Sequence, residues 1–83
     1  MNSVDKIVGS IIQQKRRMLR LTQTQLGDKI GVAYSTIACY ENGTRGMSLG
    51  TFFKLCEILR LDPNEVQKQV DDCIKRGVDA VWC

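Results

Sequence analysis

The sequence has no histidine, one proline and few aromatic side chains among its 83 residues. Histidine is the side chain that most often acts as a general acid or base near neutral pH, so its absence removes the commonest catalytic group. There is no glycine-rich phosphate loop either, and the adjacent Asp71 and Asp72 fit a solvated surface better than a catalytic pair. The sequence therefore predicts a protein that is not an enzyme and needs no cofactor.

Four cysteines are present, but they lack the spacing of a metal site. Cys39, Cys56, Cys73 and Cys83 are separated by 17, 17 and 10 residues, and none forms a C-x-x-C pair. Structural zinc sites use paired cysteines or histidines at short spacing, so we predict no metal site. Because the N-terminus is too polar for a secretory signal, we expect the thiols to be free.

No apolar run approaches the roughly 18 residues that cross a bilayer as a helix. Together with the polar N-terminus, this predicts a cytoplasmic protein with no membrane partner. A length of 83 residues predicts one small unit whose modest core gives marginal stability unless two copies associate.

Basic residues concentrate in the first part of the chain. Residues 1–47 contain seven basic and three acidic side chains, a net charge of +4, whereas residues 48–83 have five and six, a net charge of −1. Chance clustering on a solvated surface is the simpler explanation. A face that meets a polyanion is the alternative, which we favour because the basic half also contains the motif described next.

Residues 22–43 have the pattern of two short helices joined by a tight turn. Thr22 is a good N-cap, and Gln25 three residues later completes a capping box. Gly31 and Gly43 stand where the two helices end, a position that favours a residue with positive φ. Helices of about eight residues are unstable alone in water, so the rest of the chain must supply a surface for them to pack on.

The segments TQTQLGDKIGV and STIACYENG resemble the helix-turn-helix of the lambdoid phage repressor and Cro family, also called Xre-like regulators. The matching positions are Gln23, Leu26, Gly27, Gly31, Val32, Ile37, Glu41 and Gly43. The resemblance extends from about Ile7 to Val66. It implies an all-α fold, a compact five-helix bundle of the lambda-repressor-like DNA-binding type.

Periodicity and capping residues predict where the five helices lie. We expect them at about Val4–Leu19, Gln23–Ile30, Tyr34–Glu41, Ser48–Arg60 and Pro63–Arg76. The first helix should bury the face of Val4, Ile7, Val8, Ile11, Met18 and Leu19, and the fourth should be mostly buried. We divide the chain into a DNA-binding domain, residues 1–66, and a C-terminal helix extension with an apolar tail, residues 67–83.

The resemblance implies that the helix at Tyr34–Glu41 is a recognition helix in the major groove of DNA. Tyr34, Ser35 and Cys39 then occupy the positions that read bases, with Thr36 and Ala38 at the margins. None of these side chains makes a bidentate bond to a base, so we expect contacts to thymine methyls and readout of DNA shape. For Tyr34, the alternative is that its ring folds back over the turn.

The resemblance also implies contacts to the DNA backbone. We expect phosphate contacts from Gln23, Thr44, Arg45 and Arg17. For Gln23 the alternative, which we do not favour, is an ordinary first residue of its helix. Arg16 and Glu41 should form a partly buried ion pair that locks the first helix onto the recognition helix.

Two positions depart from the family pattern. Arg20 stands where the family often has glycine, so it is either a left-handed residue or part of a different loop path. Ala33 stands at the N-cap of the recognition helix, where the family usually has Ser or Thr. Because alanine has no side-chain oxygen to accept a hydrogen bond, the helix should be less stable by about 1 kcal/mol than with Ser or Thr at this position.

The C-terminal part has more apolar side chains than a five-helix core needs. They either fold back on the bundle or form a dimer interface, which we favour and assign to Val70, Ile74, Val78, Val81 and Trp82. A dimer fits two recognition helices one turn of DNA apart. We therefore predict a sequence-specific transcriptional regulator, a repressor, that binds palindromic double-stranded DNA as a homodimer. The alternative is an antitoxin or co-activator that uses the same fold to bind a protein partner.

Overall fold

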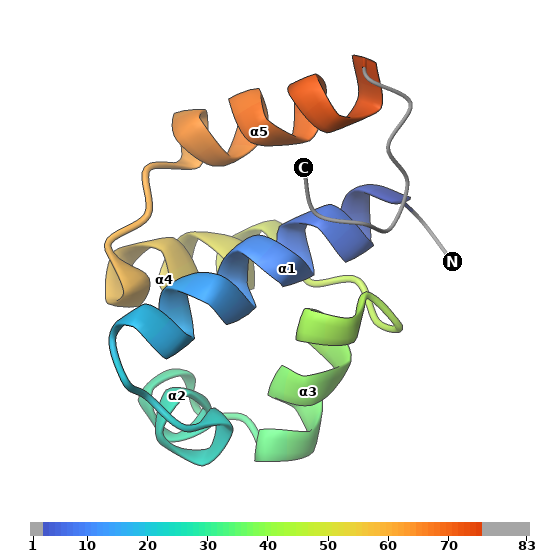
Figure 1. The fold of residues 1–83 in the computed structure, drawn as a ribbon. Coiled ribbons are helices and arrows are strands. Elements are labelled where there is room, and N and C mark those ends of the chain that lie inside the picture. The colour runs from blue at the N-terminus through green and yellow to red at the C-terminus, as the bar shows by residue number, and fades with distance from the viewer. Residues whose placement is uncertain (1–2, 76–83) are drawn as a thin grey trace.

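The computed structural model describes residues 3–75 as five α-helices, with no strand in that range (Figure 1). They are α1 (Ser3–Met18), α2 (Gln23–Ile30), α3 (Tyr34–Asn42), α4 (Leu49–Leu59) and α5 (Pro63–Lys75). The all-α, five-helix prediction is confirmed, and each helix begins within one residue of its predicted start. Over the same residues, no helix is long and apolar enough to cross a membrane.

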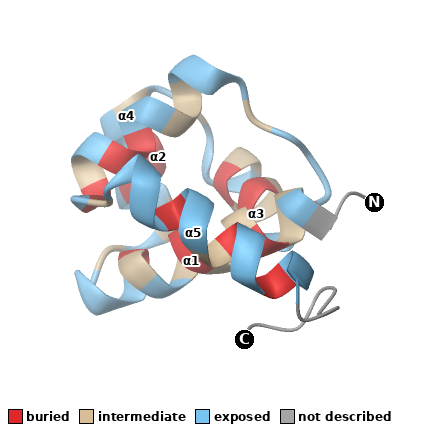
Figure 2. Ribbon diagram, turned by 90° about the horizontal axis from the view of Figure 1, so that it is seen from above, coloured by how far each residue is buried: buried red, intermediate tan, exposed pale blue. Residues whose placement is uncertain are grey.

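Helix α1 is the central element, because it contacts α3, α4 and α5. In Figure 1 it runs beside α4 through the middle of the molecule, with α5 on one side and α2 and α3 on the other. Figure 2 shows that the buried residues lie on the faces that the helices turn toward one another. The helix-turn-helix is therefore held on one side of a bundle that α5 completes from the other.

The core consists of two groups of apolar side chains that meet at α1. One group joins α1 to α2, α3 and α4 and consists of Ile12, Leu26, Ile37, Tyr40, Leu55 and Leu59. The other joins α1 to α5 and consists of Ile7, Ile11, Val66, Val70 and Cys73. Burial of these side chains is the main stabilising term that offsets the loss of chain entropy.

The predicted buried face of α1 is wrong at both ends of the helix. Met18 is 72% exposed, and Val4 and Leu19 are each 38% exposed. Ile7 and Ile11 do face α5, but further along α1 the covered face is that of Ile12 and Arg16. A seven-residue step from Ile11 therefore places Met18 where no helix covers it.

The prediction that α4 is mostly buried is also wrong. Leu55, Cys56 and Leu59 are buried, but Leu49 is 68% exposed and Phe53 is 49% exposed. The first turn of α4 extends beyond the helices that cover its second half. There it borders an open apolar groove of about 590 Å³ between α1, α4 and α5.

Helix α5 begins as predicted, because Asp62 Oδ1 accepts a hydrogen bond from the Asn64 backbone N–H at 2.9 Å. Val70 packs in the core between α1 and α5 and is 8% exposed, and its assignment to a dimer interface stays a prediction. Ile74 is exposed, and Val78, Val81 and Trp82 lie outside the described residues. The boundary predicted at residue 66 falls within α5, and the assignment of residues 67–83 to dimerisation stays a prediction.

Of the three cysteines that the structure describes, one differs from the expectation of free thiols. Cys39 and Cys56 are free, but Cys73 is disulfide-bonded. Spacing along the chain does not tell which thiols the fold brings together, so this bond could not be read from the sequence. Burial, and to a smaller extent the negative charge of Asp62, raise the pKa of the Cys56 thiol.

Gly9 lets α1 and α3 approach closely. A Cβ atom at this position would overlap the backbone carbonyl oxygen of Tyr40 and would lie 2.6 Å from that of Glu41. Neither carbonyl can move without displacing the end of α3. Gly9 therefore sets how closely that helix is seated on the bundle.

We expect Gly9→Ala to lower the free energy of unfolding by about 1–3 kcal/mol, because the added methyl group overpacks the α1–α3 contact. Gly50→Ala is the matched control, since a Cβ at this helical position meets nothing within 4 Å. Alanine in a helix is favoured over glycine, so the control should raise stability by up to about 1 kcal/mol. Urea unfolding of both variants checks this, and equal effects at the two glycines would contradict the close contact.

Candidate nucleic-acid interface

The turn between α2 and α3 is fixed by local hydrogen bonds. The predicted capping box is confirmed: the Gln25 backbone N–H donates to Thr22 Oγ1 at 3.0 Å, and the Thr22 backbone N–H donates to Gln25 Oε1 at 2.9 Å. Gly31 ends α2 with a φ of 78°, in the left-handed region. The backbone N–H of Val32 then bonds the Gly27 carbonyl at 2.9 Å, so the chain enters α3 in a defined direction.

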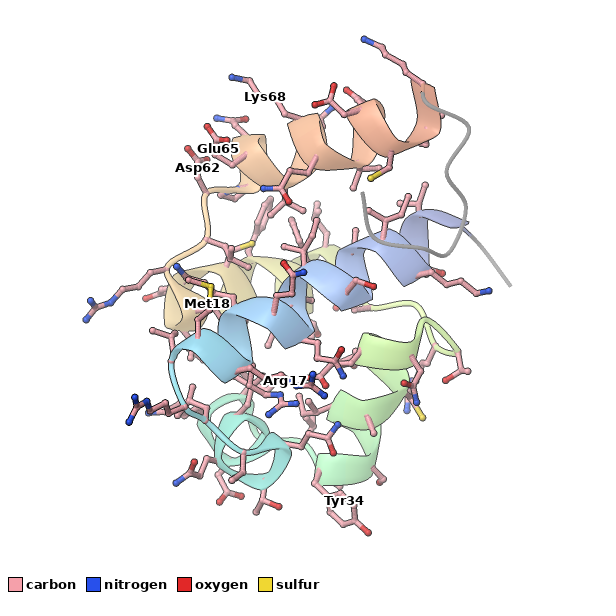
Figure 3. All side chains as sticks on the ribbon, viewed as in Figure 1. Arg17, Met18, Tyr34, Asp62, Glu65 and Lys68 are labelled. Atoms are coloured by element: carbon pink, nitrogen blue, oxygen red, sulfur yellow. The ribbon has the colours of Figure 1, made fainter. Side chains whose placement is uncertain are left out.

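Helix α3 buries one side and exposes the other. Ile37 and Tyr40 are in the core, whereas Tyr34 and Ser35 are exposed, and Thr36, Ala38 and Cys39 are half-buried. Tyr34 is 61% exposed and projects away from the bundle at the start of the helix (Figure 3). Its ring does not fold back over the turn, and of the five predicted base-reading residues Tyr34 and Ser35 are the most accessible.

The start of α3 has no side-chain cap. Ala33 takes the extended N-cap conformation but supplies no acceptor, and its carbonyl accepts from Thr36 and Ile37. The N–H groups of the first turn are therefore left without a side-chain partner from the N-cap residue. Such a helix end stabilises a negative charge placed near it.

A buried ion pair joins α1 to the end of α3. Arg16 Nε donates to Glu41 Oε2 at 2.6 Å, and Arg16 Nη2 donates to Glu41 Oε1 at 3.1 Å. Arg16 is 8% exposed and Glu41 is 5% exposed, and Arg16 Nη1 also donates to the Leu21 carbonyl at 2.7 Å. The pair that the resemblance implies is therefore present, and it also holds the loop between α1 and α2.

Gln23 also forms a hydrogen bond with this ion pair. Its Nε2 donates to Glu41 Oε1 at 3.2 Å, so the first residue of α2 touches the last turn of α3. This contact joins residues 18 positions apart, and no sequence pattern predicts it. Among residues 3–75, no buried side-chain nitrogen or oxygen lacks a hydrogen-bond partner, so each buried polar atom of the network makes at least one bond.

The other predicted phosphate-binding residues lie on the surface around α3. Thr44 and Arg45 are exposed in the loop after α3, where Thr44 Oγ1 donates to the Cys39 carbonyl at 3.3 Å. Arg17 is exposed in the last turn of α1. Arg20 has a φ of 59°, so of the two loop paths left open by the sequence, the left-handed residue is the one observed.

Comparison with known proteins places these elements in one family. Residues 12–66 match the helix-turn-helix family model, and this range contains α2, α3 and α4 entirely. The chain is 33% identical over 63 residues to y4wC of Sinorhizobium fredii, an uncharacterised HTH-type transcriptional regulator, covering 76% of this chain and 44% of the relative. It is 31% identical over 71 residues to y4aM of the same organism, covering 86% of this chain and 50% of the relative.

A further similarity is to an antitoxin. The chain is 45% identical over 40 residues to antitoxin HipB of Escherichia coli. These 40 residues are 48% of this chain and 43% of HipB. The chain thus spans about half, or less, of the length of these relatives. No solved structure gave a significant match.

We expect Arg16→Met to lower the free energy of unfolding by about 3–5 kcal/mol, because it leaves the Glu41 carboxylate buried and unpaired. Arg17→Met is the matched control, since the neighbouring Arg17 is exposed, and it should change stability by less than about 0.5 kcal/mol. Adding Glu41→Leu to Arg16→Met should restore much of the loss, since no charge then stays buried. Urea unfolding measures all three, and equal costs for the two arginines would contradict the buried pair.

Proposed function

This chain belongs to the helix-turn-helix family of DNA-binding transcriptional regulators, and we propose that it is a repressor that binds a palindromic operator as a homodimer. The observation that carries the proposal is the accessible face of α3. Its side chains stand clear of the described bundle, while the opposite side is anchored by buried Ile37 and Tyr40. A helix presented in this way fits the major groove.

In this proposal the backbone contacts fix the position of the helix, and α3 reads the sequence. Arg17 and Arg45 supply positive charge, and Gln23 supplies an amide N–H. The Thr44 hydroxyl donates to a phosphate once it releases the Cys39 carbonyl. Tyr34, Ser35 and Cys39 meet the base edges, with Thr36 and Ala38 beside them. Because these side chains are short or apolar, specificity comes from thymine methyl contacts and DNA shape rather than from bidentate hydrogen bonds.

The exposed apolar surface supports the proposed dimer. Val4, Leu49 and Phe53 border the groove between α1, α4 and α5, and Ile74 is exposed on α5. We propose a second copy of this chain as the occupant of that surface, whose groove Val70 also lines. In a two-fold interface both copies use the same surface patch. Here Phe53 is exposed at the border of the groove, so the Phe53 side chain of each copy can pack against the groove of the other. The contribution of Val78, Val81 and Trp82 stays a prediction.

In this proposal the protein represses transcription through the place where it binds DNA. A dimer that covers a promoter prevents RNA polymerase from using the same DNA. The two recognition helices must then lie about 34–36 Å apart, one turn of the double helix.

A second candidate function is an antitoxin, favoured by the similarity to HipB. In that case the apolar surface at Leu49 and Phe53 would bind a protein partner. An antitoxin of this kind and a repressor are distinguished by what the purified protein binds and by how binding responds to salt.

Selection of binding sites from random DNA duplexes tests the proposed function. We expect an enriched inverted repeat with half-sites about 10 base pairs apart. With Arg17 and Arg45 from two protomers on phosphates, affinity should fall roughly 100-fold for a fourfold rise in salt concentration. Replacing Arg45 by Gln should weaken binding to all sequences alike and reduce the salt slope, whereas replacing Tyr34 by Ala should change the preferred sequence.

Three outcomes of the selection would count against the proposal. The absence of any enriched sequence would contradict sequence-specific binding. Enrichment of single half-sites would contradict the dimer on a palindrome. A protein that binds no duplex but binds a protein partner with little dependence on salt would favour the antitoxin.

A further inference from the structure

We infer that Glu41 is a positioning residue for Gln23: the carboxylate that fixes the recognition helix also turns the Gln23 amide so that a free N–H faces a DNA phosphate. The inference rests on the proposed function and deepens it. It links the seating of α3 to a backbone contact made by α2.

The orientation of the amide follows from what a carboxylate can accept. Glu41 Oε1 lies 3.2 Å from Gln23 Nε2, and an ionised carboxylate accepts hydrogen bonds but donates none. The flipped amide would place the Gln23 carbonyl oxygen against the carboxylate, which is repulsive. The NH₂ group therefore faces Glu41, and because it has two N–H bonds, one is left to donate elsewhere.

The position of Gln23 directs the remaining N–H toward an anion. Gln23 is the first residue of α2, and its side chain is half-buried between α2 and α3. The N-terminus of a helix carries partial positive charge, which favours a phosphate oxygen there. The capping box uses the Gln25 backbone N–H, and the backbone N–H of Gln23 itself lies outside that box.

Arg16 makes the arrangement compatible with DNA. A bare carboxylate next to the Gln23 amide would repel a phosphate that approaches the same group. Two hydrogen bonds from Arg16, at 2.6 Å and 3.1 Å, offset the charge of Glu41. Three helices thus meet at the Glu41 carboxylate. Arg16 from α1 and Gln23 from α2 donate to it, and Glu41 on α3 accepts, so all three helices determine which way the Gln23 amide faces.

A double-mutant cycle on the selected operator tests the inference. Glu41→Gln should weaken DNA binding by about 3–10-fold in the natural background, the range expected for one hydrogen bond. In the Gln23→Ala background the same change should cause a smaller loss, since the residue that Glu41 positions is absent and only the seating of α3 is affected. Gln14→Ala is the matched control, because Gln14 is exposed on α1 outside the network.

The result that would overturn the inference is an equal loss in both backgrounds. Glu41 would then act only by holding α3, whether or not Gln23 is present. Thermal unfolding of each variant shows whether it is folded at the temperature of the binding assay.

A second measurement covers the case in which Glu41→Gln does not fold. In the unmodified free protein, NMR relaxation of the side-chain amides should show Gln23 to be restricted and Gln14 to be mobile. A Gln23 amide as mobile as that of Gln14 would overturn the inference.

The two experiments separate this inference from the proposed function. If the unmodified protein binds no duplex, the proposed function fails, and the presentation of Gln23 to a phosphate fails with it. If the protein binds its operator but shows no coupling between Gln23 and Glu41, the inference alone fails.

Discussion

The buried bond between Arg16 and Glu41 is the interaction on which the rest of the structure depends. It joins the middle helix of the bundle to the end of α3, and Arg16 also holds the carbonyl of Leu21 in the loop before α2. A buried pair of this kind adds little net stability compared with apolar side chains, but breaking it is costly. Its value here lies in geometry, since it sets the position of α3 relative to α1 and to the loop before α2.

Packing contacts also fix the position of α3 on the bundle. The absence of a side chain at Gly9 lets α1 approach the carbonyls of Tyr40 and Glu41, and Ile37 and Tyr40 fill the core beneath α3. A helix of nine residues would not be stable alone in water, so its conformation is imposed by these contacts. Within residues 3–75 no other helix covers the opposite face, and it is the face that carries exposed Tyr34 and Ser35.

Features that depend on neighbours along the chain could be predicted from the sequence. The capping box of Thr22 and Gln25 spans three residues, and Gly31 ends α2 as its position indicates. Periodicity identified the helices but not where a covering helix stops, so Met18, Leu49 and Phe53 are more exposed than expected and Val70 is less. The contact between Gln23 and Glu41 depends on the angle between two helices, which no local pattern records. The family resemblance supplied the ion pair, but only the coordinates show that Gln23 joins it.

The central claim is that the exposed side of α3 lies against DNA bases. NMR titration of isotope-labelled protein with its selected operator tests this most directly, because each backbone amide reports on its own surroundings. The account predicts that the largest shift changes fall on Tyr34–Cys39, with a second set in the loop at Thr44 and Arg45. Changes confined to the first turn of α4, with α3 unaffected, would contradict it.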